Sequence, residues 1–339
     1  LNDRGADLTT ADLLKNFLFS QAGPHVRYIE ENWIALEASF DKPDDLVRFI
    51  RYEYASRHGA VSTRKLYRAI QEDLATSGSS AKKYVERLSK AKQVYLALRD
   101  PDSAYWQDVE VEVRDALLAY RRFQFESSLP VLLAAFLSWK KRDAAHLLVK
   151  MAKWSVRALF AGNIGARLSE DVFGEAAVAI SAGEARNQPA VRQKLARLIP
   201  TDAAFKAQFI AYGSVPTARA KYLLAMLERA QSHKQSKTAQ PFDWASQGVN
   251  IEHVLSQAAA KTSDQAAALV DTIGNLALLE KRLNRDLADK PFEAKRAIYA
   301  ESAFALTQAV GGLEAWDESA ITTRTKQLAE LACVAWPYR

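Results

Sequence analysis

Apolar residues recur at helical spacing over most of this chain, from residue 9 to residue 231. Leu13, Leu14 and Phe17 form one such stripe, and Thr9 before them is a residue type that caps helix N-termini. Helix-breaking residues separate the successive patterns, at Gly59, 77–80, Pro101, 162–165, Pro200 and Pro216. No fixed repeat period links the patterns, so they predict a series of unequal helices rather than a solenoid.

The pattern changes in the last third of the chain. The polar stretch 232–248 predicts a linker or exposed loop. Two short apolar runs follow at 249–255 and 273–279, and both fit strands. Helical spacing returns after the second run. The predicted fold is therefore mainly α, with a helical region over 1–231 and a strand–loop–strand–helix domain embedded in helices over 249–339.

Composition limits the kind of protein that this chain can be. Hydrophobic residues make up 49% of the 339 residues, enough for packed cores and too many for a disordered chain. The formal charge of +6 permits a phosphate-bearing partner without requiring one. Cys333 is the single cysteine, which excludes internal disulfides and cysteine-rich zinc sites. No apolar window reaches the roughly 20 residues of a membrane span and no secretory signal is visible, so we expect a cytoplasmic protein.

Four residues in the C-terminal part supply the groups that phosphodiester hydrolysis at neutral pH needs. His253, at the end of the first predicted strand, is the residue type best suited to be the base. Beside it, Glu252 offers a carboxylate oxygen to Mg²⁺ or Mn²⁺, and two adjacent side chains can reach one site where a strand ends. Asn275 and Asn284 follow, and an amide oxygen suits a hard cation or can hold an imidazole.

Each of these residues alone also has a structural interpretation. A single histidine in an apolar run, such as His253, is more often buried and hydrogen-bonded. An asparagine after a glycine, such as Asn275, is usual in turns. Asn284 alone fits a helix cap, and Glu252 alone fits a solvated strand position. The functional hypothesis therefore depends on the order and spacing of all four.

Basic residues near these four are candidates for contacts with nucleic-acid phosphates. Arg282 and Arg285 flank Asn284 and would lie beside the active site. A second basic stretch with tryptophans runs through 139–167, and its alternative interpretation is a solvated helix face. The other histidines have no carboxylate or cysteine at ligand spacing and are expected at surface or capping positions: His25, His58, His146 and His233.

The C-terminal motifs resemble those of HNH-type (His-Me finger) nucleases, which have a ββα-metal fold. The first strand of these enzymes is similar to residues 251–257, IEHVLSQ. Their second strand and metal-binding asparagine are similar to residues 274–279, GNLALL, followed by Asn284. Later helices of one subgroup are similar to the positions of Phe292, Lys295, Tyr299, Ser302, Trp316, Ile321, Arg324 and Trp336. That subgroup is the nuclease domain of GmrSD-type, modification-dependent (type IV) restriction enzymes and related phage-defence proteins, and the resemblance covers about residues 242–339.

The resemblance implies a metal-dependent DNA endonuclease of bacterial anti-phage defence. His253 would be the general base, Glu252 and Asn284 would hold Mg²⁺ or Mn²⁺, and Asn275 would orient His253. Lys295 would make a phosphate or a structural contact. Double-stranded DNA, modified or unmodified, is the implied partner.

Two positions depart from the family pattern. Ser256 stands where the family commonly has proline, which would loosen the turn after His253. The acidic ligand is Glu252 rather than the aspartate of many HNH nucleases, so its carboxylate reaches one methylene further. Neither departure removes a chemical group that the reaction needs.

The first residues carry a second resemblance. Residues 1–5 and 8–16 are similar to the late part of the ParB-like, nucleotide-binding N-terminal domain of the same proteins. The Asp-Gly-Gln-Gln-Arg motif that identifies that domain is absent from this sequence, which begins with Leu1. We therefore expect a fragment of a longer protein whose nucleotide-binding domain is a missing partner, and we assign no nucleotide hydrolysis to it.

Two other functions are compatible with the same sequence. A non-catalytic helical module with a degenerate nuclease fold would bind DNA or a protein without cleaving anything. An RNA-directed nuclease would use the same residues, because such a site contacts phosphates rather than sugars. Comparing plasmid and RNA substrates, and testing His253→Ala, distinguishes the three.

Overall fold

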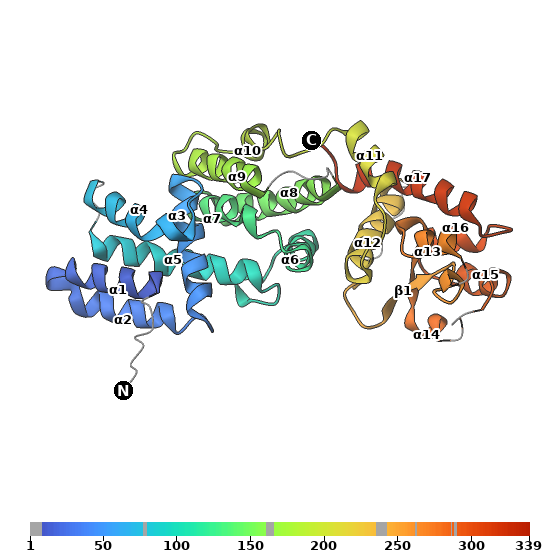
Figure 1. Ribbon diagram of the computed structural model, residues 1–339, viewed down its shortest axis with the longest axis horizontal. Coiled ribbons are helices and arrows are strands. Elements are labelled where there is room, and N and C mark those ends of the chain that lie inside the picture. Colours follow the sequence, from blue (N-terminus) through green and yellow to red (C-terminus); the bar gives the residue numbers. More distant parts are fainter. Residues whose placement is uncertain are drawn as a thin grey trace. The chain divides into compact units, whose positions relative to one another are not determined.

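The computed structural model describes residues 9–76, 80–160, 166–234, 243–261, 263–285, 287 and 290–339. Helices, with 3₁₀ turns included, take 72% of these residues. Within the described ranges, the strands form one two-stranded antiparallel sheet near the C-terminal region (Figure 1). The prediction of a mainly α fold with a strand pair is therefore confirmed.

The chain divides into two compact units, the first made of Leu1–Ala152 and Ile164–Leu198 and the second of Lys153–Asn163 and Ile199–Arg339. The first unit contains α1 (Thr10–Ser20), η1 (Gly23–His25), α2 (Val26–Glu37), α3 (Pro43–His58), α4 (Thr63–Thr76), α5 (Ala81–Arg99), η2 (Ala104–Trp106), α6 (Val111–Phe123), η3 (Glu126–Ser128), α7 (Leu129–Ser138), the start of α8 (Lys141–Phe160), α9 (Ala166–Ser181) and α10 (Gln188–Lys194). The second contains the end of α8, then α11 (Asp202–Ala211), α12 (Thr217–Lys234), β1 (Val249–His253), η4 (Ala259–Lys261), α13 (Asp264–Leu269), η5 (Ile273–Asn275), β2 (Leu276–Glu280), α14 (Lys281–Asn284), α15 (Phe292–Ala300), α16 (Ala305–Gly311) and α17 (Glu318–Ala335).

Local sequence signals start the helices where the pattern predicts. Thr9 caps α1: its hydroxyl accepts from the Asp12 backbone N–H, and the Asp12 carboxylate accepts from the Thr9 backbone N–H. The Ser80 hydroxyl caps α5 with a single bond, accepted from the backbone N–H of Lys83. Each such cap stabilises its helix by about 1 kcal/mol.

The first unit is built around α7, which packs against α3, α5 and α9. Residues 129–136 of this helix are all buried, as expected for a helix that is apolar on every side. Gly174 lets α9 approach the chain after α3, because a Cβ there would lie 2.7 Å from the backbone nitrogen of Ala60. None of the described helices is both long and apolar enough to cross a bilayer.

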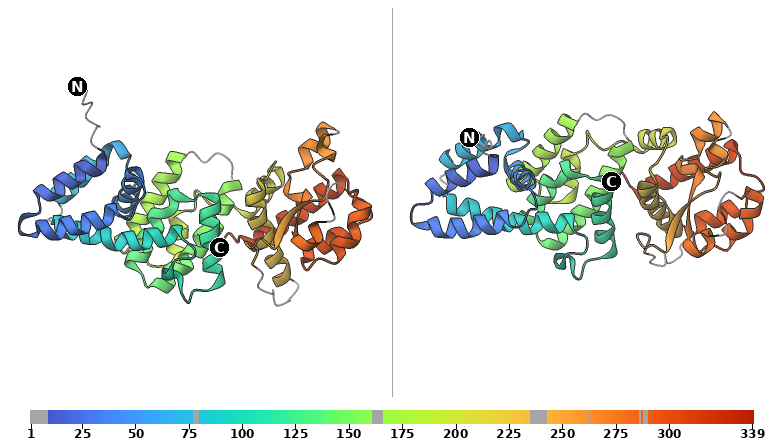
Figure 2. Two further views of the ribbon diagram at one scale, coloured as in Figure 1. Left: turned by 90° about the horizontal axis from the view of Figure 1, so that it is seen from below. Right: turned by 60° about the horizontal axis from the view of Figure 1, so that its bottom comes forward.

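The second unit holds the strand pair. β1 and β2 pair antiparallel, in a register that runs from Val249 opposite Glu280 to His253 opposite Leu276. α12 and α14 contact both strands, and α16 contacts β2; Figure 2 shows the strands beside α12 from two further sides. β2 begins three residues later than the predicted run, because Ile273–Asn275 form a 3₁₀ turn. Both predicted strands are therefore present with slightly shifted ends.

The second unit begins earlier in the chain than the predicted nuclease domain. We expected a helical region up to residue 231, but α12 lies in the second unit and packs on both strands and α17. The polar stretch that predicted a linker is a loop inside this unit: Trp244 is 1% exposed and stacks edge-on against Tyr222 of α12. Residues 235–242 of that stretch lie outside the described residues. Polar composition marked a loop here, and a domain boundary does not follow from a loop.

Candidate active site

The end of β1 carries the two residues predicted to act together, and the strand sends them to different partners. Glu252 lies opposite Ala277 and is 6% exposed, whereas His253 lies opposite Leu276 with 14% of its side chain exposed. Adjacent residues of a strand point to opposite faces. Glu252 hydrogen-bonds to α15 and His253 to the segment after α13, so in this structure the two side chains share no partner among the described residues.

Glu252 is held by two side chains of α15. Its Oε1 accepts from the Lys295 ammonium at 2.8 Å and from the Tyr299 hydroxyl at 2.7 Å. Lys295 also donates to the backbone carbonyl of His253 at 3.2 Å. Lys295 and Tyr299 are both fully buried and four positions apart, which places them on one helix face. Burial, followed by the neighbouring carboxylate, raises the pKa of Tyr299, so its hydroxyl is a permanent donor to Glu252.

Lys295, for which we expected a phosphate or a structural contact, lies inside the protein. Its side chain is 0% exposed and its ammonium is paired with Glu252. A buried ammonium persists only when it is paired and hydrogen-bonded. The contacts of Lys295 with Glu252 and with the His253 carbonyl favour the structural alternative.

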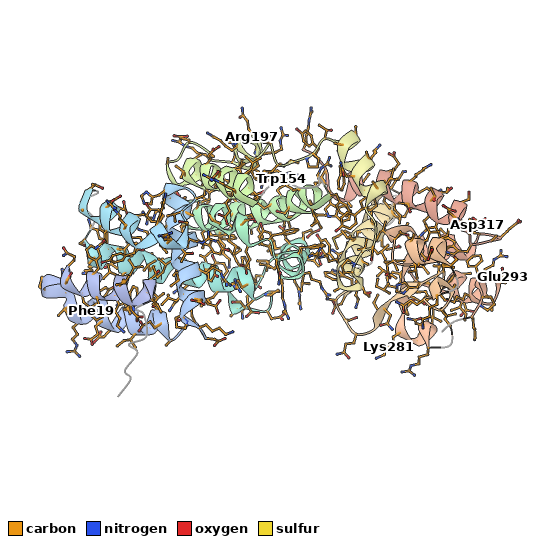
Figure 3. All side chains as sticks on the ribbon, in the orientation of Figure 1. Phe19, Trp154, Arg197, Lys281, Glu293 and Asp317 are labelled. Atoms are coloured by element: carbon orange, nitrogen blue, oxygen red, sulfur yellow. The ribbon has the colours of Figure 1, made fainter. Side chains whose placement is uncertain are left out.

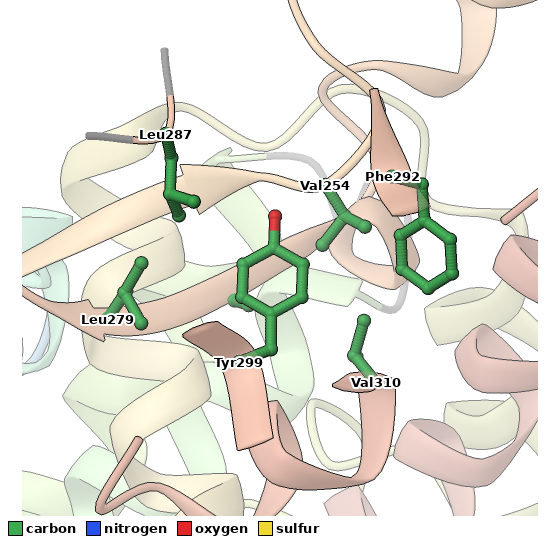
Figure 4. Close-up of a cluster of buried hydrophobic side chains, with 7 residues drawn as sticks. Val254, Leu279, Leu287, Phe292, Tyr299 and Val310 are labelled. Carbon is green, nitrogen blue, oxygen red and sulfur yellow. The ribbon is translucent and has the colours of Figure 1, made fainter. Parts of the chain in front are cut away.

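A hydrophobic cluster that includes Tyr299 joins α15 to β2 beside this ion pair. Its buried members are Val254, Ala277, Leu279, Leu287, Phe292, Tyr299 and Val310. In Figure 4 the Tyr299 ring stands among Leu279, Leu287 and Val254, with its hydroxyl pointing away from α15. Trp316 packs on the rim and stacks on Phe292 at 5.8 Å between ring centroids. Apolar packing thus holds the Glu252 carboxylate in a fixed place.

The His253 ring contacts an aspartate that sequence reasoning missed. Its Nε2 lies 3.1 Å from Oδ1 of Asp271, whose side chain is 45% exposed. Asp271 lies between α13 and η5, just before the Gly274 turn. It is 18 residues from His253 along the chain, with no periodic relation to it. The one available signal was an acidic residue two positions before the predicted second strand.

Asn275 is buried and bonds to the backbone rather than to the His253 ring. Its Oδ1 accepts from the Leu255 N–H at 2.7 Å and from the Trp316 indole at 2.9 Å. Its Nδ2 donates to the carbonyls of Leu255 and Val270. These four bonds use both amide hydrogens and two oxygen lone pairs, so the direct contact with His253 that we expected is absent among the described residues. Asn275 instead fixes the backbone two residues after His253.

The turn after His253 has a hydroxyl cap in place of the proline usual in the family pattern. Ser256 Oγ accepts from the Ala259 backbone N–H at 3.2 Å. A serine side chain stabilises such turns through this bond. A pocket of about 480 Å³ borders this turn, lined by Val254, Leu255, Ser256, Phe292 and Trp316 among others. The end of β1 is therefore next to solvent-accessible space.

The predicted metal-binding asparagine and Arg282 lie on α14, which packs on both strands, and Arg285 follows its last residue. Asn284 is partly buried, and its side-chain amide has no hydrogen-bond partner within the described ranges. Arg282 and Arg285 are exposed and make no ion pair with any described residue. Figure 3 shows the side chain of Lys281, at the start of α14, extending outward. This short helix thus offers an amide oxygen and several cations to a ligand.

The predicted site offers few oxygen ligands to a hard divalent cation. In the part of the chain that is described, no group of three or more His, Cys, Asp and Glu side chains could hold a metal. Glu252 uses only Oε1 in its bonds to Lys295 and Tyr299, and Oε2 accepts from no described residue. That oxygen and the Asn284 amide are two hard donors. Mg²⁺ commonly takes one or two protein oxygens and completes its shell with water and phosphate.

One family of known proteins matches this unit. Residues 199–331 match the family described as GmrSD restriction endonucleases, C-terminal domain. The match starts where the second compact unit resumes, at Ile199, and includes the strand pair, α14 and α15. No curated protein matches the chain significantly. The resemblance of the C-terminal motifs to GmrSD-type proteins is thereby confirmed, over a segment that begins earlier in the chain than the one on which it was first seen.

Proposed function

Because residues 199–331 form a GmrSD restriction endonuclease C-terminal domain, we propose that the chain is a metal-dependent DNA endonuclease with His253 as its general base. Membership of this family implies nuclease function in restriction. The proposed setting is the bacterial cytoplasm, where the enzyme would nick or cleave invading DNA, modified or unmodified. The observation that carries the proposal is the position of His253, at the exit of β1 with one ring nitrogen bonded to a carboxylate.

His253 would take a proton from a water molecule as the water oxygen attacks phosphorus. The bond from phosphorus to the leaving sugar oxygen then breaks, and solvent protonates that oxygen. An imidazole suits this step because its ordinary pKa lies near neutral pH. The Asn275 bonds to Leu255 keep the strand end, and so the ring, in place.

Glu252 and Asn284 would hold Mg²⁺ or Mn²⁺ through Glu252 Oε2 and the Asn284 amide oxygen. When bound, the cation neutralises charge on the phosphate and acts as a Lewis acid. Lys295 and Tyr299 would keep the Glu252 carboxylate in one orientation, as the partners of metal ligands commonly do. Arg282 and Arg285 would bind the DNA backbone beside the scissile phosphate.

A plasmid-nicking assay tests the proposal. With Mg²⁺, the wild-type protein should convert supercoiled plasmid to the nicked form, and His253→Ala should lower the rate by roughly 100- to 10,000-fold, the usual contribution of a general base. A chelator should abolish nicking in the wild type. An RNA substrate of similar length should be cleaved much more slowly.

His146→Ala is the matched control. His146 also lies beside a carboxylate, with its Nε2 3.4 Å from Glu110 in the first unit, and its loss should leave nicking unchanged. DNA binding without nicking by the wild type would favour the non-catalytic module instead. Equal nicking by wild type and His253→Ala would exclude His253 as the base.

A further inference from the structure

The His253 ring has a dedicated partner that no motif assigns. Asp271 Oδ1 lies 3.1 Å from His253 Nε2. Among the described residues, the Asp271 carboxylate forms an ion pair with no other side chain. At neutral pH a carboxylate only accepts hydrogen bonds, so the shared hydrogen is on Nε2. The other ring nitrogen, Nδ1, then carries the free lone pair.

We propose that Asp271 is the positioning residue of the general base: its carboxylate holds His253 in the Nε2–H tautomer, so that Nδ1 takes the proton from water. The inference rests on the proposed function of His253 and names which ring nitrogen acts. Asp271 itself exchanges no proton with the substrate. Its contribution is to fix one tautomer and one ring orientation, as a carboxylate does for the histidine of a catalytic triad.

The backbone around Asp271 is held firmly enough for this role. The Asp271 carbonyl accepts from the Val215 N–H at 2.8 Å, and Ser214 and Thr272 form an isolated antiparallel bridge. The Thr272 hydroxyl donates to the carbonyl of Leu269 at 2.7 Å. The segment 214–215, which precedes α12, therefore anchors the aspartate from outside the strand pair.

The arrangement also explains why Asn275 is free for another task. The sequence assigned the orienting role to Asn275, but three of its side-chain hydrogen bonds tie the backbone at Leu255 and Val270 and the fourth is accepted from the Trp316 indole. Asn275 positions the strand end and Asp271 positions the ring. A base needs both, because the imidazole must be correctly placed and correctly protonated.

Asp271→Ala and Asp271→Asn test the proposal when compared with wild type and His253→Ala. Asp271→Ala should lower kcat for plasmid nicking by roughly 10- to 100-fold, the usual cost of removing such a partner, with KM nearly unchanged. The effect should be smaller than that of a fully buried triad aspartate, because Asp271 is half-exposed. Asp271→Asn should recover part of the rate, since its amide oxygen can accept from Nε2–H. Asp264→Ala, which removes an exposed carboxylate from the same α13 region, should have no effect.

Proton NMR of histidine-labelled protein gives a second readout that does not depend on nicking. The wild type should show a slowly exchanging Nε2–H signal from His253, which Asp271→Ala and His253→Ala should both lose. A signal that persists in Asp271→Ala would overturn the proposal even if the protein cleaves no DNA. Full kcat in Asp271→Ala, in an enzyme that loses activity in His253→Ala, would overturn it while leaving the proposed function intact.

Discussion

The two units differ in the polar side chains that they bury. Among the described residues, the first unit buries Glu53, Ser56, Asp115 and Ser128. The second buries Ser155, Arg157, Glu228, Glu252, Asn275, Lys295, Ser302, Thr307, Arg324 and Thr325. Buried polar groups are costly unless they are fully bonded. The second unit therefore contains more buried polar side chains, which need hydrogen-bond partners, than the first.

One ion pair from each unit illustrates this difference in burial. Glu53 is fully buried, but its partner Arg57 keeps 19% of its side chain exposed. Glu252 and Lys295 are 8% and 0% exposed, so both side chains are buried. A fully buried pair adds little net stability compared with apolar residues of the same size. We infer that the second pair is kept for the geometry that it imposes at the end of β1.

The largest expected effect comes from breaking the buried pair. Lys295→Ala should lower the free energy of unfolding of the second unit by about 3–5 kcal/mol, because it leaves the Glu252 charge buried and unpaired. Arg57→Ala in the first unit should cost less, because the Arg57 side chain reaches the surface and its removal lets water reach the Glu53 carboxylate. Denaturant unfolding followed by tryptophan fluorescence measures both. A larger loss in Arg57→Ala would remove the contrast between the units.

The next effect comes from the buried amide. Asn275→Ala removes four hydrogen bonds of about 1 kcal/mol each and should destabilise the second unit by about 4 kcal/mol. Asn187→Ala is the matched change in the first unit, where the side chain caps α10 with one bond to the Ala190 N–H. That variant should lose only about 1 kcal/mol. Equal decreases in melting temperature for the two variants would show that the four bonds of Asn275 stabilise the protein no more than the single bond of Asn187.

Replacing one glycine by alanine in each unit should reduce stability by an intermediate amount and should affect nicking only in the second unit. A Cβ at Gly274 would collide with Thr325 Oγ1 and lie 2.5 Å from the Ile321 carbonyl, and one at Gly174 would lie 2.7 Å from the Ala60 nitrogen. Each variant should lose about 2 kcal/mol through overpacking. Gly274→Ala should also slow nicking, because it displaces the turn between Asp271 and β2, whereas Gly174→Ala should not. Nicking rates measured well below both melting temperatures separate the two outcomes.

The smallest expected effect is on pH dependence, and its sign differs between the units. Burial, followed by the Arg57 charge, lowers the pKa of His58, so the first unit loses stability as pH falls from 6.5 through that lowered value. Burial raises the pKa of Glu228, so the second unit gains stability from this group as pH falls through its raised pKa toward 4.5. Melting temperatures measured against pH test both trends. The His58→Gln variant should lack the first pH dependence, and the Glu228→Gln variant should lack the second. If a pH dependence persists after its residue is replaced, another titratable group causes it.

The sequence predicts the parts of this molecule that depend on neighbouring residues. The Thr9 cap and both strands follow from local pattern, and each is present. The site follows only partly. The contact between His253 and Asp271 joins segments 18 residues apart, and it depends on a bridge from Ser214 that no local pattern encodes.

Besides the contact between His253 and Asp271, the burial of individual side chains could not be predicted from the sequence. Lys295 has the residue type of an exposed phosphate contact, and its place on the inner face of α15 became evident only when the helix was packed. The start of the second unit differs from the expected domain start for a related reason: the helical spacing of α12 does not reveal that this helix packs on both strands and on α16 and α17. Spacing identifies a helix without identifying its neighbours.

Chemical rescue tests the central claim most directly. Nicking by His253→Ala should fall to background and should rise again, in proportion to concentration, when imidazole is added to the assay with Mg²⁺. His146→Ala, treated in the same way, should nick at the wild-type rate with or without imidazole. Nicking by His253→Ala at the wild-type rate before any imidazole is added would contradict the account, because no imidazole at the end of β1 would then be needed.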